Sequence, residues 1–277
     1  MPDLLFQNVA IVGVGLLGGS IGMAIRERGV AARVVGIGRR ESSLQVALDR
    51  GAVDEVTMDL DEGVDEADLV VIATPVGKIV DAARAVAALR PDTLTTDVGS
   101  TKAEVVASLA ELRFIGSHPM AGDHHTGCDH ARPDLLEDRL VLITPLEQSE
   151  PEDVCRITDF WTALGASVHA MEPHEHDAIV AAVSQMPHLV AAALSVTTPS
   201  ELVAYAGQGW RDATRIAAGD PELWLEIVTS NRANIIQQLA AVEHAIAEIR
   251  RALENGQDEA LLEILQEAKQ KRDAVGS

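Results

Sequence analysis

A glycine-rich turn near the start of the chain constrains the fold more than any other feature. Residues 6–12 form an apolar segment, residues 13–18 read Gly-Val-Gly-Leu-Leu-Gly, and a helical pattern continues to about residue 28. In a strand–turn–helix setting, the first glycine permits a tight turn, the second lets the backbone approach a pyrophosphate, and the third lets helix and strand pack closely. This spacing predicts a dinucleotide-binding βα unit, with a purely structural glycine turn as the alternative.

The first part of the chain alternates between strand and helix patterns, which predicts a parallel sheet covered by helices on both faces. Further helices are expected over residues 42–50, 79–89, 102–112 and 154–164. The expected strands cover residues 6–12, 33–37, 53–56, 69–73, 94–97, 114–115, 140–144 and 167–171. We therefore expect an α/β Rossmann-type domain, with a doubly wound parallel sheet, over residues 1–171.

The pattern changes after Pro173, where strand signals end. Helices are expected over residues 174–195, 199–206, 212–218, 221–251 and 258–274. Residues 172–277 are therefore predicted to form an all-α domain. A helix over 221–251 is too long for a small monomeric domain, so it is expected to bury one face against a second copy of the chain. The C-terminal helices thus predict a homodimer.

The charge and the cysteine content exclude several classes of protein. The chain has 22 Lys and Arg against 43 Asp and Glu, a net charge of −21, which opposes binding to nucleic acid or to an anionic membrane. We find no signal peptide pattern and expect no apolar run long enough to span a bilayer. The two cysteines form no CxxC pair. These features predict a cytoplasmic protein.

The end of the second expected strand bears on the choice of cofactor. NAD sites usually carry an acidic residue there, but this position holds Gly38, followed by Arg39 and Arg40. Guanidinium groups can bind a 2′-phosphate, which favours NADP. Glu41 can still reach a ribose hydroxyl, so NAD stays possible, and the alternative for the two arginines is that they are solvated at a helix start. The residues predicted to contact the cofactor are Gly13, Gly15, Leu16, Leu17, Gly18, Arg39, Arg40, Ser43, Thr74, Pro75 and Asp97.

A single histidine stands out in residues 116–122, which read Gly-Ser-His-Pro-Met-Ala-Gly. His118, beside Pro119 and among small residues, is typical of a loop at the end of a strand that presents one imidazole to a pocket. An imidazole titrates near neutral pH and can accept a proton from a substrate hydroxyl. The alternative is a histidine in an ordinary turn.

Three further segments complete a recognisable set. They read Asp-Val-Gly-Ser-Thr-Lys at 97–102, Ser-Gln-Met-Pro-His at 184–188 and Gly-Gln-Gly-Trp-Arg-Asp-Ala-Thr-Arg-Ile-Ala at 207–217. With the glycine turn and the His118 segment, the chain resembles the prephenate/arogenate dehydrogenase family of tyrosine biosynthesis over essentially its whole length. The resemblance implies a Rossmann domain followed by a helical dimerisation domain. It also implies NAD(P)-dependent oxidative decarboxylation, which converts prephenate to 4-hydroxyphenylpyruvate or arogenate to tyrosine.

The resemblance also implies roles for individual residues. His118 matches the catalytic histidine that binds the ring hydroxyl as hydride leaves, and Ser100 matches the serine that orients this histidine and the hydroxyl. Arg215 matches an arginine that binds a substrate carboxylate, and His188 a second active-site histidine near the substrate side chain. Ser100 can instead cap the following helix, and His188 can be a packed core histidine.

Two further positions are expected to face the substrate. Arg211 lies one helical turn before Arg215, so both can face one pocket unless Asp212 pairs with one of them. Gly122 and His124 belong to a loop that departs from the usual family pattern, so the choice between prephenate and arogenate stays open. The histidines and the cysteine near this loop fit no standard zinc spacing, and no metal is expected.

Two other classes of protein remain as alternatives. A β-hydroxyacid dehydrogenase shares this architecture but uses a catalytic lysine after the sheet, whereas no lysine lies between Lys102 and Lys269. A non-catalytic dimer that senses a nucleotide would keep the cofactor site alone. The joint presence of His118, Ser100 and Arg215 argues against such a sensor.

Overall fold

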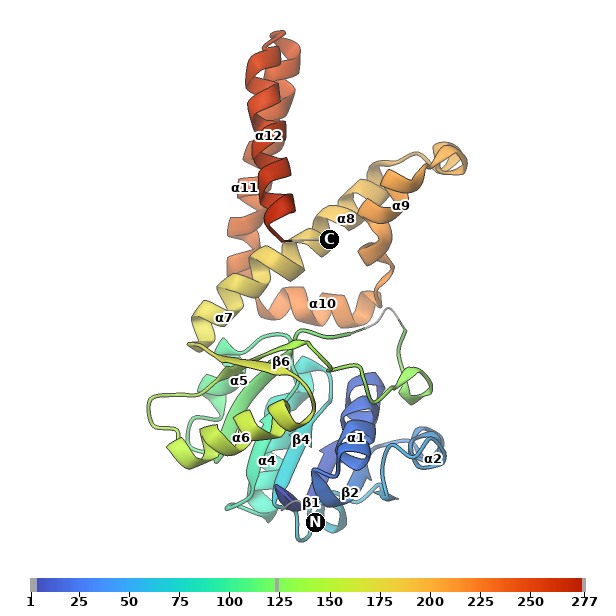
Figure 1. Ribbon diagram of the computed structural model, residues 1–277, viewed down its shortest axis with the longest axis vertical. Helices are drawn as coiled ribbons and strands as arrows, with labels where there is room; N and C mark the ends of the chain where they lie inside the picture. Colours follow the sequence, from blue (N-terminus) through green and yellow to red (C-terminus); the bar gives the residue numbers. More distant parts are fainter. Residues whose placement is uncertain (1–3, 123–124, 276–277) are drawn as a thin grey trace. The chain divides into compact units, whose positions relative to one another are not determined.

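The computed structural model describes residues 4–122 and 125–275. Within them, one sheet of eight strands has the order β3-β2-β1-β4-β5-β6-β7-β8. Figure 1 labels β1, β2, β4 and β6 of this sheet. The strands are β1 (Phe6–Val12), β2 (Ala31–Ile37), β3 (Glu55–Thr57), β4 (Leu69–Ile72), β5 (Leu94–Asp97), β6 (Phe114–Pro119), β7 (Leu140–Thr144) and β8 (Ser167–Ala170). The first six strands pair in parallel and have the order of a dinucleotide-binding sheet, which confirms the predicted fold class.

Helices cover both faces of this sheet because its strands are apolar on both sides. Neighbouring residues of β1 enter different cores: Val9 and Ile11 join one cluster and Ala10 joins the other. The first cluster includes residues of α1 (Leu16–Arg28), α2 (Glu41–Asp49) and α6 (Pro151–Ala163), and the second includes residues of α4 (Ile79–Leu89) and α5 (Ala103–Ser108). The short helices α3 (Leu60–Gly63), η1 (Val76–Lys78) and η2 (Cys128–His130) complete the α/β part.

The glycine turn after β1 has the geometry that its sequence predicts. Gly13 has a φ of +100°, and a Cβ there would lie 2.7 Å from the carbonyl oxygen of Ala73. A Cβ on Gly18 would lie 2.0 Å from the carbonyl oxygen of Gly13. Neither position tolerates a side chain, so β1, β4 and α1 pack together only because glycine stands at both.

One strand differs from the prediction in a way that matters for the site. Residues 116–119 continue β6 instead of forming a loop, and His118 pairs with Leu142 of β7. β7 runs antiparallel to β6; among the described residues between them, the helical segment is the short turn η2, whereas a parallel return usually needs a longer crossover. His118 therefore lies on a strand that is paired on its β7 side, which is a more rigid support than the expected loop.

The helical part begins with α7 (Pro173–Val180), the π-helical segment η3 (Ala181–Gln185) and α8 (Met186–Thr197), which form one continuous stretch. It continues through η4 (Ser200–Tyr205), α9 (Gln208–Thr214), η5 (Arg215–Ala218) and α10 (Pro221–Ser230). The stretch 173–197 is long and apolar enough to cross a membrane by length and composition, with 28% of its most apolar window buried. The expectation that no run reaches this length was therefore wrong, while the expected lack of membrane binding stays a prediction.

The expected helix over 221–251 is in fact two helices. It is interrupted at Asn231, which separates α10 from α11 (Arg232–Glu254). Asn231 is buried, and its amide donates hydrogen bonds to the Asp177 carbonyl and the Gln185 side chain, both at 2.7 Å. A buried asparagine that bonds to other helices competes with the local helical pattern.

A second compact unit covers residues 232–277, whereas the first covers residues 1–231. Its helices α11 and α12 (Asp258–Ala274) contact each other and are joined by a turn in which Gly256 has a φ of +62°. This division by compactness falls later than the predicted boundary between residues 171 and 172, which stays a prediction.

Candidate active site

A pocket of about 470 Å³ lies within the first unit, between the carboxyl ends of the central strands and the helices that follow the sheet. Four of the segments that the sequence analysis singled out meet there, together with α10. Its lining residues are Ser100, His118, Pro119, Met120, Ala121, Gly122, Ser184, Gln185, Arg215, Ile216, Gly219, Trp224 and Ile227. Ligands of open α/β sheets bind at this edge, so the pocket is the candidate active site.

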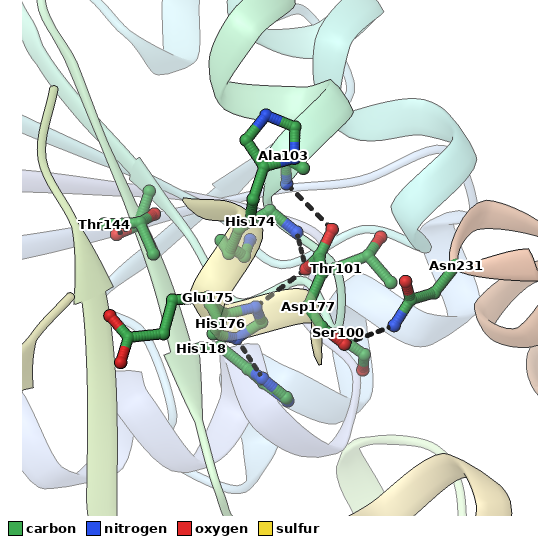
Figure 2. Close-up of polar contacts among 12 residues, drawn as sticks. Ser100, Thr101, Ala103, His118, Thr144, His174, Glu175, His176, Asp177 and Asn231 are labelled. Atoms are coloured by element: carbon green, nitrogen blue, oxygen red, sulfur yellow. Dashed lines mark hydrogen bonds and ion pairs between the residues drawn. The ribbon is translucent and has the colours of Figure 1, made fainter. Parts of the chain in front are cut away.

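His118 is the titratable group of the sheet that reaches this pocket. Its Nδ1 lies 2.9 Å from Nε2 of His176, and Nδ1 of His176 lies 2.8 Å from Oδ1 of Asp177 (Figure 2). Burial, and the nearby His176 and Lys102, hold the pKa of His118 well below its ordinary value of 6.5. The ring is therefore neutral at physiological pH, as a proton acceptor must be.

Asp177 links this series of hydrogen bonds to the start of α5. Its carboxylate accepts hydrogen bonds from the backbone N–H groups of Lys102, at 2.8 Å, and Ala103, at 3.0 Å (Figure 2). Asn231 donates to the carbonyl of Asp177. The side chain is thus held from several directions, and it fixes the position of His176 in turn.

A buried ion pair supports the segment that contains Ser100. Lys102 and Asp97 have no exposed side-chain surface, and their charged groups pair directly. Asp97 also accepts the N–H groups of Gly99, at 2.8 Å, and Ser117, at 3.0 Å. Burial lowers the pKa of Lys102, opposed by the attraction of Asp97. The carboxylate of Asp97 is thus bonded to internal partners, and its predicted contact with the cofactor stays a prediction.

Ser100 lines the pocket, as expected, but does not hold His118 in the expected way. No hydrogen bond joins the two side chains among the contacts of the described residues; the carbonyl of Ser100 accepts from Gln185 at 3.4 Å. Since His176 occupies Nδ1 of His118, the orientation of the His118 ring comes from α7. The role of Ser100 toward the substrate stays a prediction.

His188 lies behind the pocket wall. Its ring stacks on Trp224 with centroids 3.5 Å apart and an interplanar angle of 10°. Trp224 lines the pocket, whereas His188 is buried and is absent from the described lining. Burial lowers the pKa of His188. In this structure, the surface that faces a ligand is therefore the indole of Trp224.

Only one of the two expected arginines belongs to the described pocket. Arg215 lines it and Arg211 does not. α9 ends at Thr214 and Arg215 begins a 3-10 turn, so the regular one-turn spacing of an α-helix does not apply. Asp212 accepts a hydrogen bond from Gln208 at 2.8 Å instead of pairing with an arginine. Gly122 also lines the pocket, while His124 lies outside the described residues.

The start of α1 fits a dinucleotide. A Cβ on Gly15 would meet nothing within 4 Å, and no side chain of the described residues caps this helix. Its free N–H groups can therefore bind phosphate oxygens. The buried hydroxyl of Thr74 has no hydrogen-bond partner among the described residues, which leaves one polar group available beside Gly13.

The other predicted cofactor residues surround this turn or follow β2. Leu16 and Leu17 are half-buried in the first turn of α1, and Pro75 is exposed directly before η1, in the segment that follows β4. Arg39 and Arg40 are exposed directly after β2, with Ser43 half-buried in the first turn of α2. The arrangement of Gly38 and two exposed guanidinium groups at this edge is as the sequence suggested, and the preference for NADP stays a prediction.

Sequence reasoning missed the residues behind His118. His176 and Asp177 were seen only as part of a helix start, and Lys102 only as part of a motif. A signal was available, because an adjacent histidine and aspartate in the first turns of a helix that follows the sheet can face its carboxyl edge. Among the described residues, no three His, Cys, Asp or Glu side chains lie close enough to hold a metal. The expected absence of a metal stays a prediction.

Comparisons with known proteins match both parts of the chain. A model of the nucleotide-binding domain of prephenate dehydrogenase matches residues 21–170, and one of its dimerization domain matches residues 172–267. The prephenate dehydrogenase of Bacillus subtilis is 32% identical, covering 97% of this chain and 76% of the relative. The cyclohexadienyl dehydrogenase of Zymomonas mobilis is 30% identical, covering 98% and 96%.

Solved structures agree with these matches. Prephenate dehydrogenase from Aquifex aeolicus, in complex with hydroxyphenyl propionate and NAD+, superposes with a TM-score of 0.91 at 32% identity, covering 97% of this chain and 98% of that one. Arogenate dehydrogenase from Synechocystis gives 0.82 at 27% identity, covering 97% and 100%. A 3-hydroxyisobutyrate dehydrogenase from Mycobacterium tuberculosis, at 0.52 and 18% identity, shares the fold alone.

Proposed function

This chain belongs to the prephenate dehydrogenase family, and from that premise we propose that it oxidatively decarboxylates prephenate to 4-hydroxyphenylpyruvate in tyrosine biosynthesis. It is a dehydrogenase that uses a pyridine nucleotide. The observation that carries the proposal is the imidazole of His118 in the wall of a pocket that also contains Arg215, with burial lowering the pKa of His118.

The choice of prephenate follows from charge. Prephenate carries two carboxylates, whereas arogenate adds an ammonium group that needs an acceptor. Among the lining residues that the structure describes, Arg215 supplies a guanidinium group and none supplies a carboxylate. A carboxylate binds well to a bidentate guanidinium, and a buried ammonium without a partner is costly. Arogenate is the second candidate substrate, since a relative in the same family acts on it by name.

The chemistry assigned to the chain is acid–base catalysis and positioning. A bound nicotinamide dinucleotide supplies the hydride acceptor. His118 accepts the proton of the ring hydroxyl at Nε2 as the carbinol carbon loses hydride, and returns it to the same oxygen when loss of CO2 makes the ring aromatic. Arg215 binds a carboxylate of the substrate. Trp224 and Ile227 form an apolar wall that excludes water from the reacting ring.

For the cofactor, we infer a preference for NADP, with NAD as the alternative. Support comes from Gly38 at the position where NAD sites carry an acid, and from the exposed guanidinium groups of Arg39 and Arg40 beside it. The phosphates are assigned to Gly13, Gly15 and the start of α1. We further propose a homodimer through the helices that follow the sheet and a cytoplasmic location; the match to a dimerization domain supports the former.

One experiment tests these assignments together. Purified protein is assayed with prephenate and arogenate, each with NAD and NADP, and kcat/KM is compared across the four combinations. Prephenate with NADP is expected to give the highest value. Turnover of neither substrate, in protein that binds the cofactor, would overturn the proposed function.

A further inference from the structure

The hydrogen bonds behind His118 carry an inference about how this residue is prepared for catalysis. We propose that His176, held by Asp177, is a positioning residue that fixes the neutral tautomer of His118 with its proton on Nδ1 and its lone pair on Nε2. This inference rests on the proposed function, in which Nε2 accepts the substrate proton. It explains why a histidine that receives no hydrogen bond from Ser100 in this structure still presents one defined nitrogen to the pocket.

The direction of the hydrogen bonds is set at the Asp177 end. Its carboxylate accepts two backbone N–H groups, those of Lys102 and Ala103, which can only donate. These donors at the start of α5 stabilise the ionised carboxylate. An ionised carboxylate can only accept, so the proton in the contact with His176 lies on Nδ1 of that ring.

The same reasoning extends to His118. A neutral His176 with its proton on Nδ1 presents a lone pair at Nε2, which lies 2.9 Å from Nδ1 of His118. Nδ1 of His118 must then carry the proton and donate it. Its Nε2 has no hydrogen-bond partner among the described residues, so it keeps its lone pair on a ring that lines the pocket.

The charges around the two rings bear on this arrangement. Lys102 and Asp97 are buried beside them, and Asp177 is the acidic neighbour of His176. His174 and Glu175 on α7, and Glu104 on α5, are exposed to solvent.

A doubly protonated His176 would reverse the direction of its hydrogen bond to His118. The proton of His118 would then lie on Nε2, which would block catalysis. The ammonium of Lys102 opposes a further buried cation at His118.

The arrangement also stabilises the state that follows proton uptake. Once His118 holds protons on both nitrogens, its bond to His176 becomes a charge-assisted hydrogen bond, which is stronger than the neutral one. His176 stays neutral and keeps its bond to Asp177. No movement of side chains is needed, so the cost of reorganisation is small.

The proton position can be read directly. Protein labelled with 15N-histidine gives two-bond 1H–15N correlations that distinguish an Nδ1–H from an Nε2–H imidazole, and loss of signals in His118→Asn identifies those of His118. The free enzyme is expected to show His118 protonated on Nδ1 near neutral pH. In His176→Leu, this preference is expected to disappear. An Nε2–H form in the unmodified protein, or an unchanged tautomer in the variant, would overturn the proposal.

Kinetics separate positioning from simple packing. His176→Leu is expected to lower kcat on the order of 10²-fold while leaving KM and cofactor affinity near their original values, because only the acid–base step is affected. His174→Leu, an exposed neighbour on the same helix, is the matched control and should change neither. Equal losses in kcat and in cofactor affinity would mean that His176 only maintains the structure.

A second variant covers a failure to fold. His176→Asn keeps a polar group near Asp177 but is too short to reach His118, so it should also lose the tautomer preference. The tautomer is measured without substrate, which keeps this proposal apart from the proposed function. Absence of turnover on both cyclohexadienyl substrates would contradict the function, whereas an Nε2–H His118 in an active enzyme would contradict only the positioning role.

Discussion

The burial of the ion pair between Lys102 and Asp97 predicts how much stability is lost when one partner is removed. Neither side chain is exposed, so water does not screen the pair. Removal of one partner from such a pair costs about 3–5 kcal/mol, because the other charge stays buried without compensation. Asp97 keeps two backbone donors, Gly99 and Ser117, which places Lys102→Met near the lower end, at about 3 kcal/mol.

This loss is measurable as a change in thermal unfolding. At about 2–4 °C per kcal/mol for a chain of this size, Lys102→Met should lower Tm by roughly 6–12 °C. The double variant Asp97→Asn with Lys102→Met removes both charges and should recover part of the loss, giving a positive coupling in a double-mutant cycle. Differential scanning calorimetry of the four proteins tests this. An unchanged Tm in Lys102→Met, or strictly additive losses in the double variant, would refute the reasoning.

Three further predictions concern the site. Since burial lowers the pKa of His118 below 6.5, the acidic limb of kcat/KM should lie below pH 6.5. As pH drops, the unfolded chain protonates this histidine before the folded protein does, so the free energy of unfolding should also fall below pH 6.5. An acidic limb above pH 7 would contradict both expectations. Arg215→Ala should raise KM for prephenate at least tenfold, because roughly 1.5–3 kcal/mol of charged hydrogen bonding to the substrate is lost. Arg211→Ala is the comparison variant, and an unchanged KM in Arg215→Ala would contradict the prediction. Replacing Arg39 and Arg40 by Ala should shift preference from NADP toward NAD; a constant ratio of kcat/KM values would exclude them from 2′-phosphate binding.

Local sequence rules predicted the α/β part because its signals are local. The glycine turn, the apolar strands and their spacing depend on short stretches of chain, and the glycines at positions 13 and 18 are required by contacts with adjacent backbone. The same holds for α12, whose bounds were expected at residues 258–274 and are observed there. Periodicity and turn chemistry suffice where tertiary contacts agree with them.

The deviations arise where distant parts of the chain decide. β6 extends to Pro119 because β7 pairs with it, and the break at Asn231 depends on hydrogen bonds to Asp177 and Gln185. The resemblance to a family indicated His118, Ser100 and Arg215 for the pocket. It did not indicate His176, whose role depends on a side-chain contact across 58 residues of sequence.

The central claim is that His118 accepts the proton of the substrate hydroxyl as hydride leaves the carbinol carbon, and His118→Asn tests it most directly. The variant is to be assayed for kcat with prephenate and for the Kd of the cofactor by fluorescence titration. The account predicts a fall in kcat of about 10²–10⁴-fold with an unchanged cofactor Kd. Retention of near-normal turnover, or a loss of cofactor binding equal to the loss of turnover, would contradict it.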